Sequence, residues 1–141
     1  MLRAAGHRVG AYTSPHLLRY NERLRIDGID VEDARWVAAF ERIESARAEI
    51  SLTYFEVGTL AAFLICAEAA LDAAVLEIGL GGRLDAVNLI DGDVAILTSV
   101  DLDHQSWLGD TREAIGWEKA HIFRAGKPAV IALPDPPESV L

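Results

Sequence analysis

The chain has 141 residues, of which 51% are hydrophobic and 25% charged, a length and composition that fit one folded domain at most. Its net charge of -9 excludes a protein that neutralises a nucleic-acid backbone. The longest apolar run, residues 60–67, is too short to cross a bilayer, and the N-terminus lacks the apolar stretch of a signal peptide. Cys66 is the one cysteine, so no internal disulfide forms. We therefore expect a cytoplasmic protein with no nucleic-acid or membrane partner.

Short β-type runs alternate along the chain with longer helical patterns. Four runs predict strands, at residues 8–13, 73–78, 94–100 and 128–132. The middle two are continuously apolar, which is typical of parallel strands covered on both faces. Residues 23–31 alternate and contain Asp27-Gly28, so they predict a small exposed hairpin.

Three helices are expected between these strands, over residues 32–48, 54–70 and 111–123. Asp30 and Asp110 are the predicted N-caps of the first and third. Before the second helix, Thr53 and Glu56 have the spacing of a capping box. The predicted apolar side of the first helix consists of Trp36, Val37, Phe40 and Ile43. Strands that alternate with helices predict an α/β layered fold with a mostly parallel sheet.

Glu77 stands inside an apolar strand pattern, where a carboxylate is costly unless it is paired or holds a metal. It also lies near the strand's C-terminal end, where open parallel sheets bind ligands. An ion pair with an arginine such as Arg83 is the alternative, and position alone favours a functional role.

The glycines at positions 79, 81 and 82 permit a tight turn and close approach of the backbone to a ligand. They do not complete a dinucleotide fingerprint, because Leu84 stands at the third glycine position. The chain also contains no G-x-x-x-x-G-K-[ST] run, so it lacks a phosphate-binding loop.

Other polar residues follow or face the predicted strand ends. His104 follows the third strand beside two aspartates, and a metal-ligand role and a structural role are equally favoured there. Ser14 follows the first strand, where a turn serine is the more common reading, and His16 has no evident partner and is interpreted as structural. Lys119 lies inside the third helix, where most lysines are solvated, but burial would make it a neutral nucleophile able to react with CO₂.

The type of metal is also constrained. Mg²⁺ prefers oxygen ligands and tolerates one imidazole, whereas zinc would need a cluster of histidine or cysteine that the chain does not offer.

Seven longer motifs follow one another along the chain: TSPHL (13–17), NERLRIDG (21–28), LTYFE (52–56), LEIGLGGRLDAVN (76–88), LDH (102–104), LGDTREAI (108–115) and EKA-IF (118–123). Together and in this order they resemble the bacterial bifunctional dihydrofolate synthase/folylpolyglutamate synthases of the Mur-ligase group. The resemblance implies that residues 1–141 form a partial P-loop-type central (ATPase) domain, truncated at both ends. The phosphate-binding loop and the C-terminal glutamate-binding domain of the family would be missing.

The resemblance also implies an activity, the ATP-dependent ligation of L-glutamate to dihydropteroate or folate through an acyl phosphate. We expect the parent enzyme to be monomeric, and this chain alone to be inactive and to self-associate. Two alternatives are a truncated remnant that only binds or associates, and a Mg²⁺-dependent phosphohydrolase that uses Glu77 and His104.

Site residues carry over from the family by motif. Ser14, Glu77 and His104 resemble its Mg²⁺ ligands, and Lys119 resembles its carbamylated lysine, which organises a magnesium. The residues that resemble its pterin-side substrate contacts are Thr53, Phe55, Arg83, Leu84, Asp85 and Ala86.

The chain departs from the family pattern at three positions near these residues. Gln105 replaces a hydroxyl residue, Asp101 replaces a small or apolar residue, and His121 replaces a glycine. None of these changes removes a proposed ligand. His121, two positions from Lys119, introduces bulk and a titratable ring next to that lysine.

Overall fold

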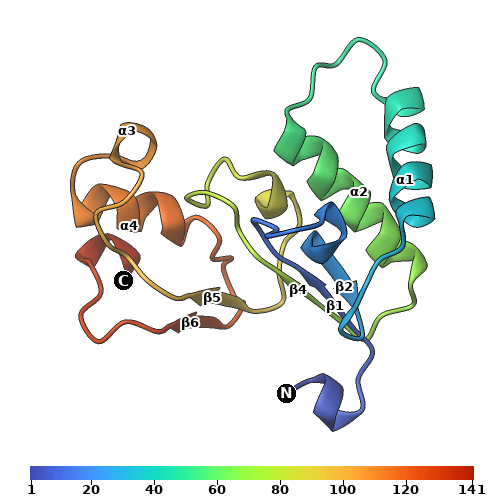
Figure 1. Ribbon diagram of the computed structural model, residues 1–141. Coiled ribbons are helices and arrows are strands. Elements are labelled where there is room, and N and C mark those ends of the chain that lie inside the picture. The colour runs from blue at the N-terminus through green and yellow to red at the C-terminus, as the bar shows by residue number, and fades with distance from the viewer. The chain divides into compact units, whose positions relative to one another are not determined.

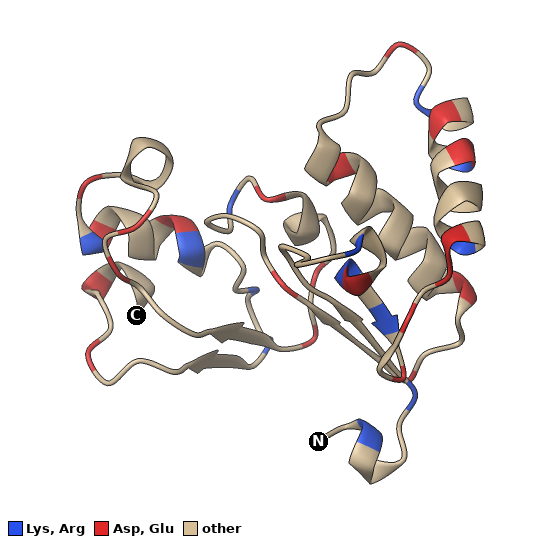
Figure 2. Ribbon diagram, viewed as in Figure 1, with Lys and Arg blue, Asp and Glu red and all other residues tan.

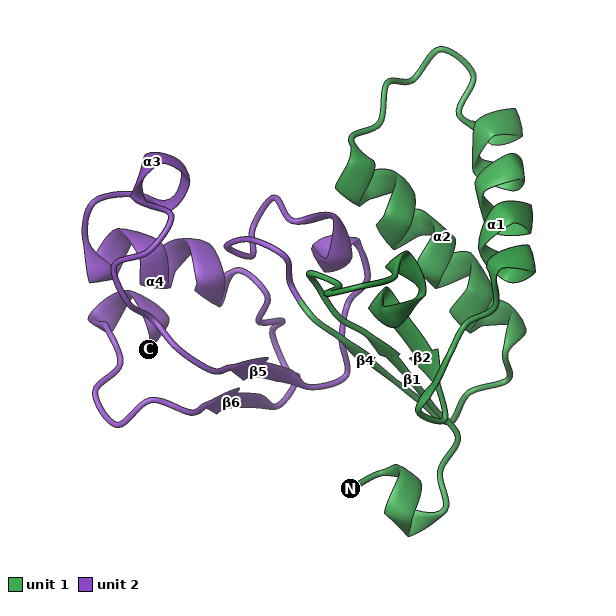
Figure 3. Ribbon diagram, in the orientation of Figure 1, with its two compact units in different colours: residues 1–77 green, residues 78–141 purple.

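The computed structural model describes residues 1–141 and divides into two compact units, Met1–Glu77 and Ile78–Leu141 (Figure 3). The assignment of all 141 residues to part of one central domain stays a prediction. None of the helices has the length and apolar character that a membrane crossing requires.

A four-stranded sheet forms the centre of the first unit. Its strands, in spatial order, are β3 (Ile29–Asp30), β2 (Leu24–Ile26), β1 (Val9–Tyr12) and β4 (Ala73–Leu76). β1 and β4 are parallel, whereas β2 and β3 form an antiparallel hairpin. Asp27 and Gly28 both have positive φ, 51° and 79°, as a two-residue type I′ turn requires. The predicted hairpin is therefore confirmed.

Two helices, α1 (Asp33–Ala46) and α2 (Tyr54–Glu68), pack against each other in the first unit (Figure 1). The hydroxyls of Tyr12 in β1 and Thr59 in α2 lie 3.2 Å apart in the buried interior, which places α2 against the sheet. At the start of α2, Thr53 and Glu56 form the predicted capping box.

Two expectations for α1 are wrong. Its N-cap is Glu32, because the Asp30 carboxylate pairs with Arg25 across the hairpin instead. Val37, expected on the apolar side, is 52% exposed, and that side is completed by the buried Ala39.

The second unit contains a two-stranded parallel sheet, β5 (Ala95–Leu97) and β6 (Ala129–Ile131). Its helices are α3 (Gln105–Leu108), which the sequence did not predict, and α4 (Arg112–Ala120). Thr111 caps α4 by accepting a hydrogen bond from the Ala114 N–H, so the prediction of Asp110 as the cap is wrong. The core of this unit contains Leu97, Val100, Ile115 and Val140.

The fold class is confirmed as α/β with parallel strand pairs. The apolar pattern of β4 and β5 is typical of strands covered on both faces, but within the 141 residues part of this apolar surface lies uncovered, as expected for the chain alone. Val75 in β4 is 51% exposed and Ile96 in β5 is 59% exposed. One apolar side of each strand therefore has no covering layer within the 141 residues.

Candidate functional site

In the first unit the structure brings Ser14 and Glu77 together. β1 and β4 are parallel neighbours, so the residues that follow them meet at the same edge of the sheet. The Ser14 N–H donates to Glu77 Oε2 at 2.7 Å, and the Glu77 N–H donates to the Tyr12 carbonyl at 2.9 Å. Glu77 Oε1 accepts no hydrogen bond from the protein, and the side chain takes part in no ion pair. One carboxylate oxygen is thus free for a cation.

Two sequence expectations about Glu77 are corrected by this geometry. Glu77 follows β4 and is exposed, so it is not a buried strand residue. The alternative ion pair with Arg83 does not form, because the guanidinium of Arg83 binds Glu118 at 2.9 Å.

His104 sits at the N-cap of α3 with φ 52° and ψ 36°, in the left-handed region. Few non-glycine residues adopt this conformation, and such strained positions cluster at functional sites. Asp103 supports it, because its Oδ1 accepts the His104 N–H at 2.7 Å and its Oδ2 lies 3.7 Å from His104 Nε2. The imidazole remains 58% exposed and is accessible to a ligand.

Lys119, in α4, is half-buried and has neither an ion pair nor a hydrogen bond for its amine. It follows the fully buried Ile115 by one helical turn, so it lies next to the core-facing side of the helix. Lys127, the other lysine, donates to Asp93 at 2.8 Å. Lys119 is therefore the one lysine that no carboxylate neutralises.

Residues 79–87, here called the glycine loop, are folded around the Asp85 carboxylate. Oδ2 of Asp85 accepts the N–H groups of Gly79 at 3.0 Å and Leu80 at 2.8 Å, and Oδ1 accepts that of Val87 at 2.8 Å. The side chain of Asp85, carried over as a substrate contact, thus organises the loop.

The glycine loop is held closely against α4. A Cβ at Gly82 would lie 2.7 Å from the Glu118 carbonyl oxygen and 2.8 Å from that of Lys119, so only glycine permits this approach. Leu84 is 81% exposed at the outside of the loop.

Arg83 is fixed by two residues of α4. Its Nε and Nη2 donate to the Glu118 carboxylate, and its guanidinium carbon lies 5.2 Å from the centre of the Trp117 ring. His121 packs edge-on against Trp117 at 4.2 Å, and its Nδ1 bonds the Trp117 carbonyl at 2.7 Å. The Arg83–Glu118 pair could not be predicted from sequence patterns, since 35 residues separate the partners.

Thr53 and Phe55 lie at the start of α2. The Thr53 hydroxyl accepts the Glu56 N–H at 3.2 Å, and its backbone N–H donates to the Glu56 carboxylate at 2.6 Å. The hydrogen bond from the Thr53 backbone N–H lowers the pKa of the Glu56 carboxyl. Phe55 is half-buried, with its ring centre 6.4 Å from that of Tyr12.

The predicted site residues are divided between the two units. Ser14, Glu77, Thr53 and Phe55 belong to the first, and His104, Lys119 and the glycine loop belong to the second. Within neither unit do three or more His, Cys, Asp or Glu side chains gather as a metal-binding group. That Ser14, Glu77 and His104 share one metal ion stays a prediction.

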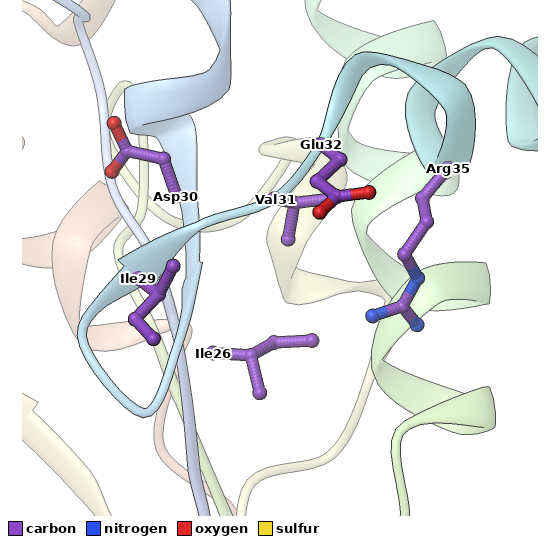
Figure 4. A pocket seen from close by; sticks show the side chains of 6 residues that line it. All are labelled: Ile26, Ile29, Asp30, Val31, Glu32 and Arg35. Atoms are coloured by element: carbon purple, nitrogen blue, oxygen red, sulfur yellow. The ribbon is translucent and has the colours of Figure 1, made fainter.

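An open hollow of 280 Å³ lies between the β2–β3 hairpin and the start of α1 (Figure 4). Its lining residues are Ile26, Ile29, Asp30, Val31, Glu32 and Arg35. Asp30 is paired with Arg25, and Arg35 donates to the Ile65 carbonyl at 3.2 Å, so its charged rim is partly engaged. None of the predicted site residues lines this hollow.

Comparison with known proteins adds to this geometry. The dihydrofolate synthase/folylpolyglutamate synthase of Escherichia coli (strain K12) is 54% identical over 140 residues, which is 99% of this chain and 33% of that protein. The chain is homologous to one segment of the dihydrofolate synthase/folylpolyglutamate synthases. It spans about a third of the length of the curated relatives that it matches. No family model matches the chain.

Solved structures of these synthases have the same fold over the shared segment. E. coli FolC in complex with DHPP and ADP matches with a TM-score of 0.97 and 55% identity, over 99% of this chain and 34% of that one. A bifunctional folylpolyglutamate synthase/dihydrofolate synthase with Mn, AMPPNP and L-glutamate bound matches with a TM-score of 0.94 and 57% identity, over 99% and 34% of the two chains. The resemblance inferred from the seven motifs is confirmed.

Proposed function

We propose that this chain is a segment of an ATP-dependent ligase that adds L-glutamate to dihydropteroate or folate. The supporting observation is its 54% identity, along 99% of its length, to a bacterial dihydrofolate synthase/folylpolyglutamate synthase. Related structures hold ADP with DHPP, or AMPPNP with Mn and L-glutamate, which are the kinds of molecule such a ligation requires. In the proposed reaction the substrate carboxylate accepts the terminal phosphoryl group of ATP, which gives an acyl phosphate and ADP, and the amine of glutamate then displaces inorganic phosphate to form the amide bond.

Ser14, Glu77 and His104 are the residues proposed to hold Mg²⁺. A free carboxylate oxygen on Glu77, a neighbouring serine and an exposed imidazole fit a hard divalent cation. Such a cation would neutralise charge on phosphate oxygens during phosphoryl transfer. Within the first unit, the hydrogen bond from the Ser14 backbone positions the Glu77 carboxylate at the sheet edge.

Lys119 is proposed to carry a carbamate, which would add a carboxylate to the magnesium site. Its amine forms neither an ion pair nor a hydrogen bond with the protein, so the nitrogen is available to react with CO₂. The glycine loop, which includes Arg83, Leu84, Asp85 and Ala86, and the start of α2 with Thr53 and Phe55, are proposed to contact the pterin-bearing substrate. The rigid packing of the loop against α4 suits this role, since preorganised contacts cost less conformational entropy on binding.

The 141 residues by themselves are proposed not to catalyse the ligation. Phosphoryl transfer depends on a phosphate cradle with a lysine, and no G-x-x-x-x-G-K-[ST] run occurs in the chain. A non-catalytic, associating protein is therefore the second candidate for the chain alone. We further propose a cytoplasmic location and a monomeric parent enzyme.

A chimera tests the proposal. The matched third of the E. coli synthase is replaced with residues 1–141, and ADP release that depends on both dihydropteroate and L-glutamate is measured. We expect activity in the chimera and none with the purified chain alone. Glu77→Gln in the chimera should reduce kcat by at least about 100-fold, because it removes a proposed metal ligand.

The matched control is Glu41→Gln, an exposed glutamate of α1 with no ion pair, which should leave kcat unchanged. A folded chimera without ligation activity would refute the proposed function. Full activity in Glu77→Gln would refute the proposed metal site alone. Glutamate- and pteroate-dependent ADP release by the isolated chain would refute the inactivity of the 141 residues.

A further inference from the structure

Arg23 is a buried cation without an acidic partner. Nine of the thirteen Lys and Arg side chains form an ion pair with an aspartate or glutamate. Figure 2 shows both signs of charge interspersed along α1. Among the four unpaired basic residues only Arg23 is buried, with 8% of its surface exposed. A buried charge without a counter-ion is costly, so this exception requires a physical explanation.

The surroundings of Arg23 hold its side chain without neutralising it. Arg23 ends the short helix η2 (Tyr20–Arg23), and its Nε–H donates to Nδ1 of His16 at 2.9 Å. The guanidinium carbon lies 5.5 Å from the ring centres of both Tyr20 and Tyr54. Burial raises the pKa of Tyr20 to about 12, so its phenol stays neutral. Cation–π contacts and a histidine acceptor stabilise the charge but supply no anion.

The nearest acidic residue in the sequence is also engaged elsewhere. Glu22 accepts the backbone N–H groups of Leu17, Leu18 and Arg19 at 2.9, 3.0 and 2.7 Å. These bonds hold its pKa near 2 and fix the loop that carries His16. The carboxylate of Glu22 is therefore committed to the backbone and forms no pair with Arg23.

The two terminal nitrogens of Arg23, Nη1 and Nη2, donate to no protein group. The only fully buried side-chain nitrogen or oxygen without a partner is Nε1 of Trp36, so neither terminal nitrogen of Arg23 is fully buried. His16 contributes a further donor. Because its Nδ1 accepts from Arg23, the neutral ring carries its proton on Nε2.

We propose that Arg23 is the anchor of a carboxylate-binding site and that the bound carboxylate completes the ion pair missing from the chain. With Nε occupied by His16, the open edge of the guanidinium is the Nη1–Nη2 pair. Two parallel N–H groups at this edge match the two oxygens of a planar carboxylate. The rings of Tyr20 and Tyr54 beside it suit a carboxylate attached to an apolar or aromatic body.

This site differs from the Ser14–Glu77 pair and gives a role to His16, which was interpreted as structural from the sequence. Both dihydropteroate and glutamate carry carboxylates, so the identity of the natural ligand rests on the proposed function. The binding of a simple carboxylate at Arg23 does not depend on the proposed function. It is measurable without ATP and without ligation, so a failed ligation assay and a failed binding assay are separate results.

The experiment is a titration of the ¹⁵N-labelled chain, with the Arg Nε–H resonances assigned by triple-resonance spectra. The probe is sodium benzoate, its neutral isostere is benzamide, and inorganic phosphate is the competing anion. We expect benzoate to shift the Arg23 Nε–H resonance saturably, and benzamide to leave it in place. No saturable shift with benzoate would refute the site, and a phosphate affinity equal to or above that of benzoate would refute the carboxylate class.

Two variants distinguish the contribution of the two parallel guanidinium N–H donors from that of the positive charge alone. Arg23→Lys keeps the charge but loses the two parallel donors, and losing one of two charge-assisted hydrogen bonds should weaken benzoate binding by about tenfold. The matched control is Arg19→Lys, an exposed arginine of the same segment that pairs with Asp33, and its benzoate affinity should be unchanged. Followed by backbone amide shifts, an unaltered affinity in Arg23→Lys would overturn the proposal. The comparison of benzoate with benzamide in the unmodified chain decides the matter even where a variant does not fold.

Discussion

Glu22 shows how one carboxylate can order a loop. Its two oxygens accept three backbone N–H groups, which lower the pKa of this carboxyl from 4.5 to about 2. A carboxyl group with a lowered pKa in the folded state stabilises the fold above its unfolded pKa. That stability is lost as the pH falls through the folded pKa.

The first prediction follows from the lowered pKa of Glu22. Between about pH 4.5 and 2 the unfolding temperature of the chain should fall, partly because Glu22 becomes protonated. Glu22→Gln removes this contribution, so its unfolding temperature should be lower at neutral pH and should depend less on pH in that range. Thermal unfolding followed by circular dichroism measures both effects. Glu41→Gln, which changes an exposed and unpaired carboxylate, should keep the slope of the original chain, and a parallel slope in Glu22→Gln would contradict the prediction.

The second prediction concerns Lys119. Carbamylation needs a neutral amine, and a carboxylate neighbour would oppose it by favouring the ammonium form. Asp93 raises the pKa of Lys127 in this way, whereas Lys119 has no such partner. In the chimera under bicarbonate, we expect a labile mass increase of one CO₂.

The control for this measurement is Lys119→Ala in the same chimera, which should lose the labile mass and most of the ligation activity. An unmodified mass in an active chimera would show that the carbamate does not belong to this residue.

At the scale of elements, α2 tolerates a glycine in its interior because a tyrosine needs the space. A Cβ at Gly58 would overlap the hydroxyl oxygen of Tyr20 and would lie 3.6 Å from that of Tyr12. Tyr20 packs edge-on against Trp36 at 4.9 Å and against Tyr54 at 5.9 Å, so it cannot move away freely. The contact between α2 and Tyr20 of η2 therefore depends on the absence of a side chain at position 58.

The third prediction uses this contact. Gly58→Ala gains about 1 kcal/mol of helix propensity. Overpacking costs about 1–3 kcal/mol, so we expect a net loss in the free energy of unfolding. In the background Tyr20→Phe, which removes the hydroxyl oxygen, the same substitution should be neutral or stabilising. Urea denaturation of the four proteins gives the coupling energy, and a coupling near zero would show that the hydroxyl does not set the spacing.

At the scale of the whole molecule, apolar strand surface without a cover governs the expected behaviour in solution. Val75 and Ile96 are 51% and 59% exposed, on strands that the sequence patterned for burial. Uncovered apolar strands recruit other chains, and burial contributes roughly 25 cal/mol per Å². Leaving a few hundred Å² of apolar surface exposed therefore forfeits several kcal/mol of burial free energy. The free energy of unfolding of a typical domain is only about 5–15 kcal/mol.

The fourth prediction is that the isolated chain self-associates or melts at low temperature, with the net charge of -9 slowing association. The double variant Val75→Thr/Ile96→Thr should associate less, because it keeps β-branched residues and removes apolar surface. Ile50→Thr, at an exposed site outside the strands, is the matched control and should change nothing. Light scattering and thermal melting measure these effects. A monodisperse monomer that melts above about 60 °C would contradict the prediction.

Local chemistry made much of this fold predictable from the sequence. The Asp27-Gly28 turn and the Thr53–Glu56 capping box each depend on residues within four positions of one another, and the structure contains both. The four strands were placed to within a few residues by apolar runs. The family was evident from motifs in order, and it supplied the site residues, of which the pairing of Ser14 with Glu77 is visible in the first unit.

Where two local options competed, the sequence pattern could not choose between them. Asp30 was a plausible helix cap, but Arg25 lies opposite it in the hairpin and takes its carboxylate. Likewise Thr111 rather than Asp110 caps α4.

The sequence by itself determined the hairpin turn, the N-terminal cap of α2 and the order of the strands and longer helices, because each depends on neighbouring residues. Only the tertiary structure decided which polar groups meet. Ser14 binds Glu77 across 63 positions, Arg83 binds Glu118 across 35, and Arg23 is buried without an acid although its motif is rich in charge. These partners depend on strand register and helix packing, which bring distant residues within hydrogen-bond range. That Arg23 is the buried cation without an acidic partner becomes visible only once the structure shows which charges pair and which side chains are buried.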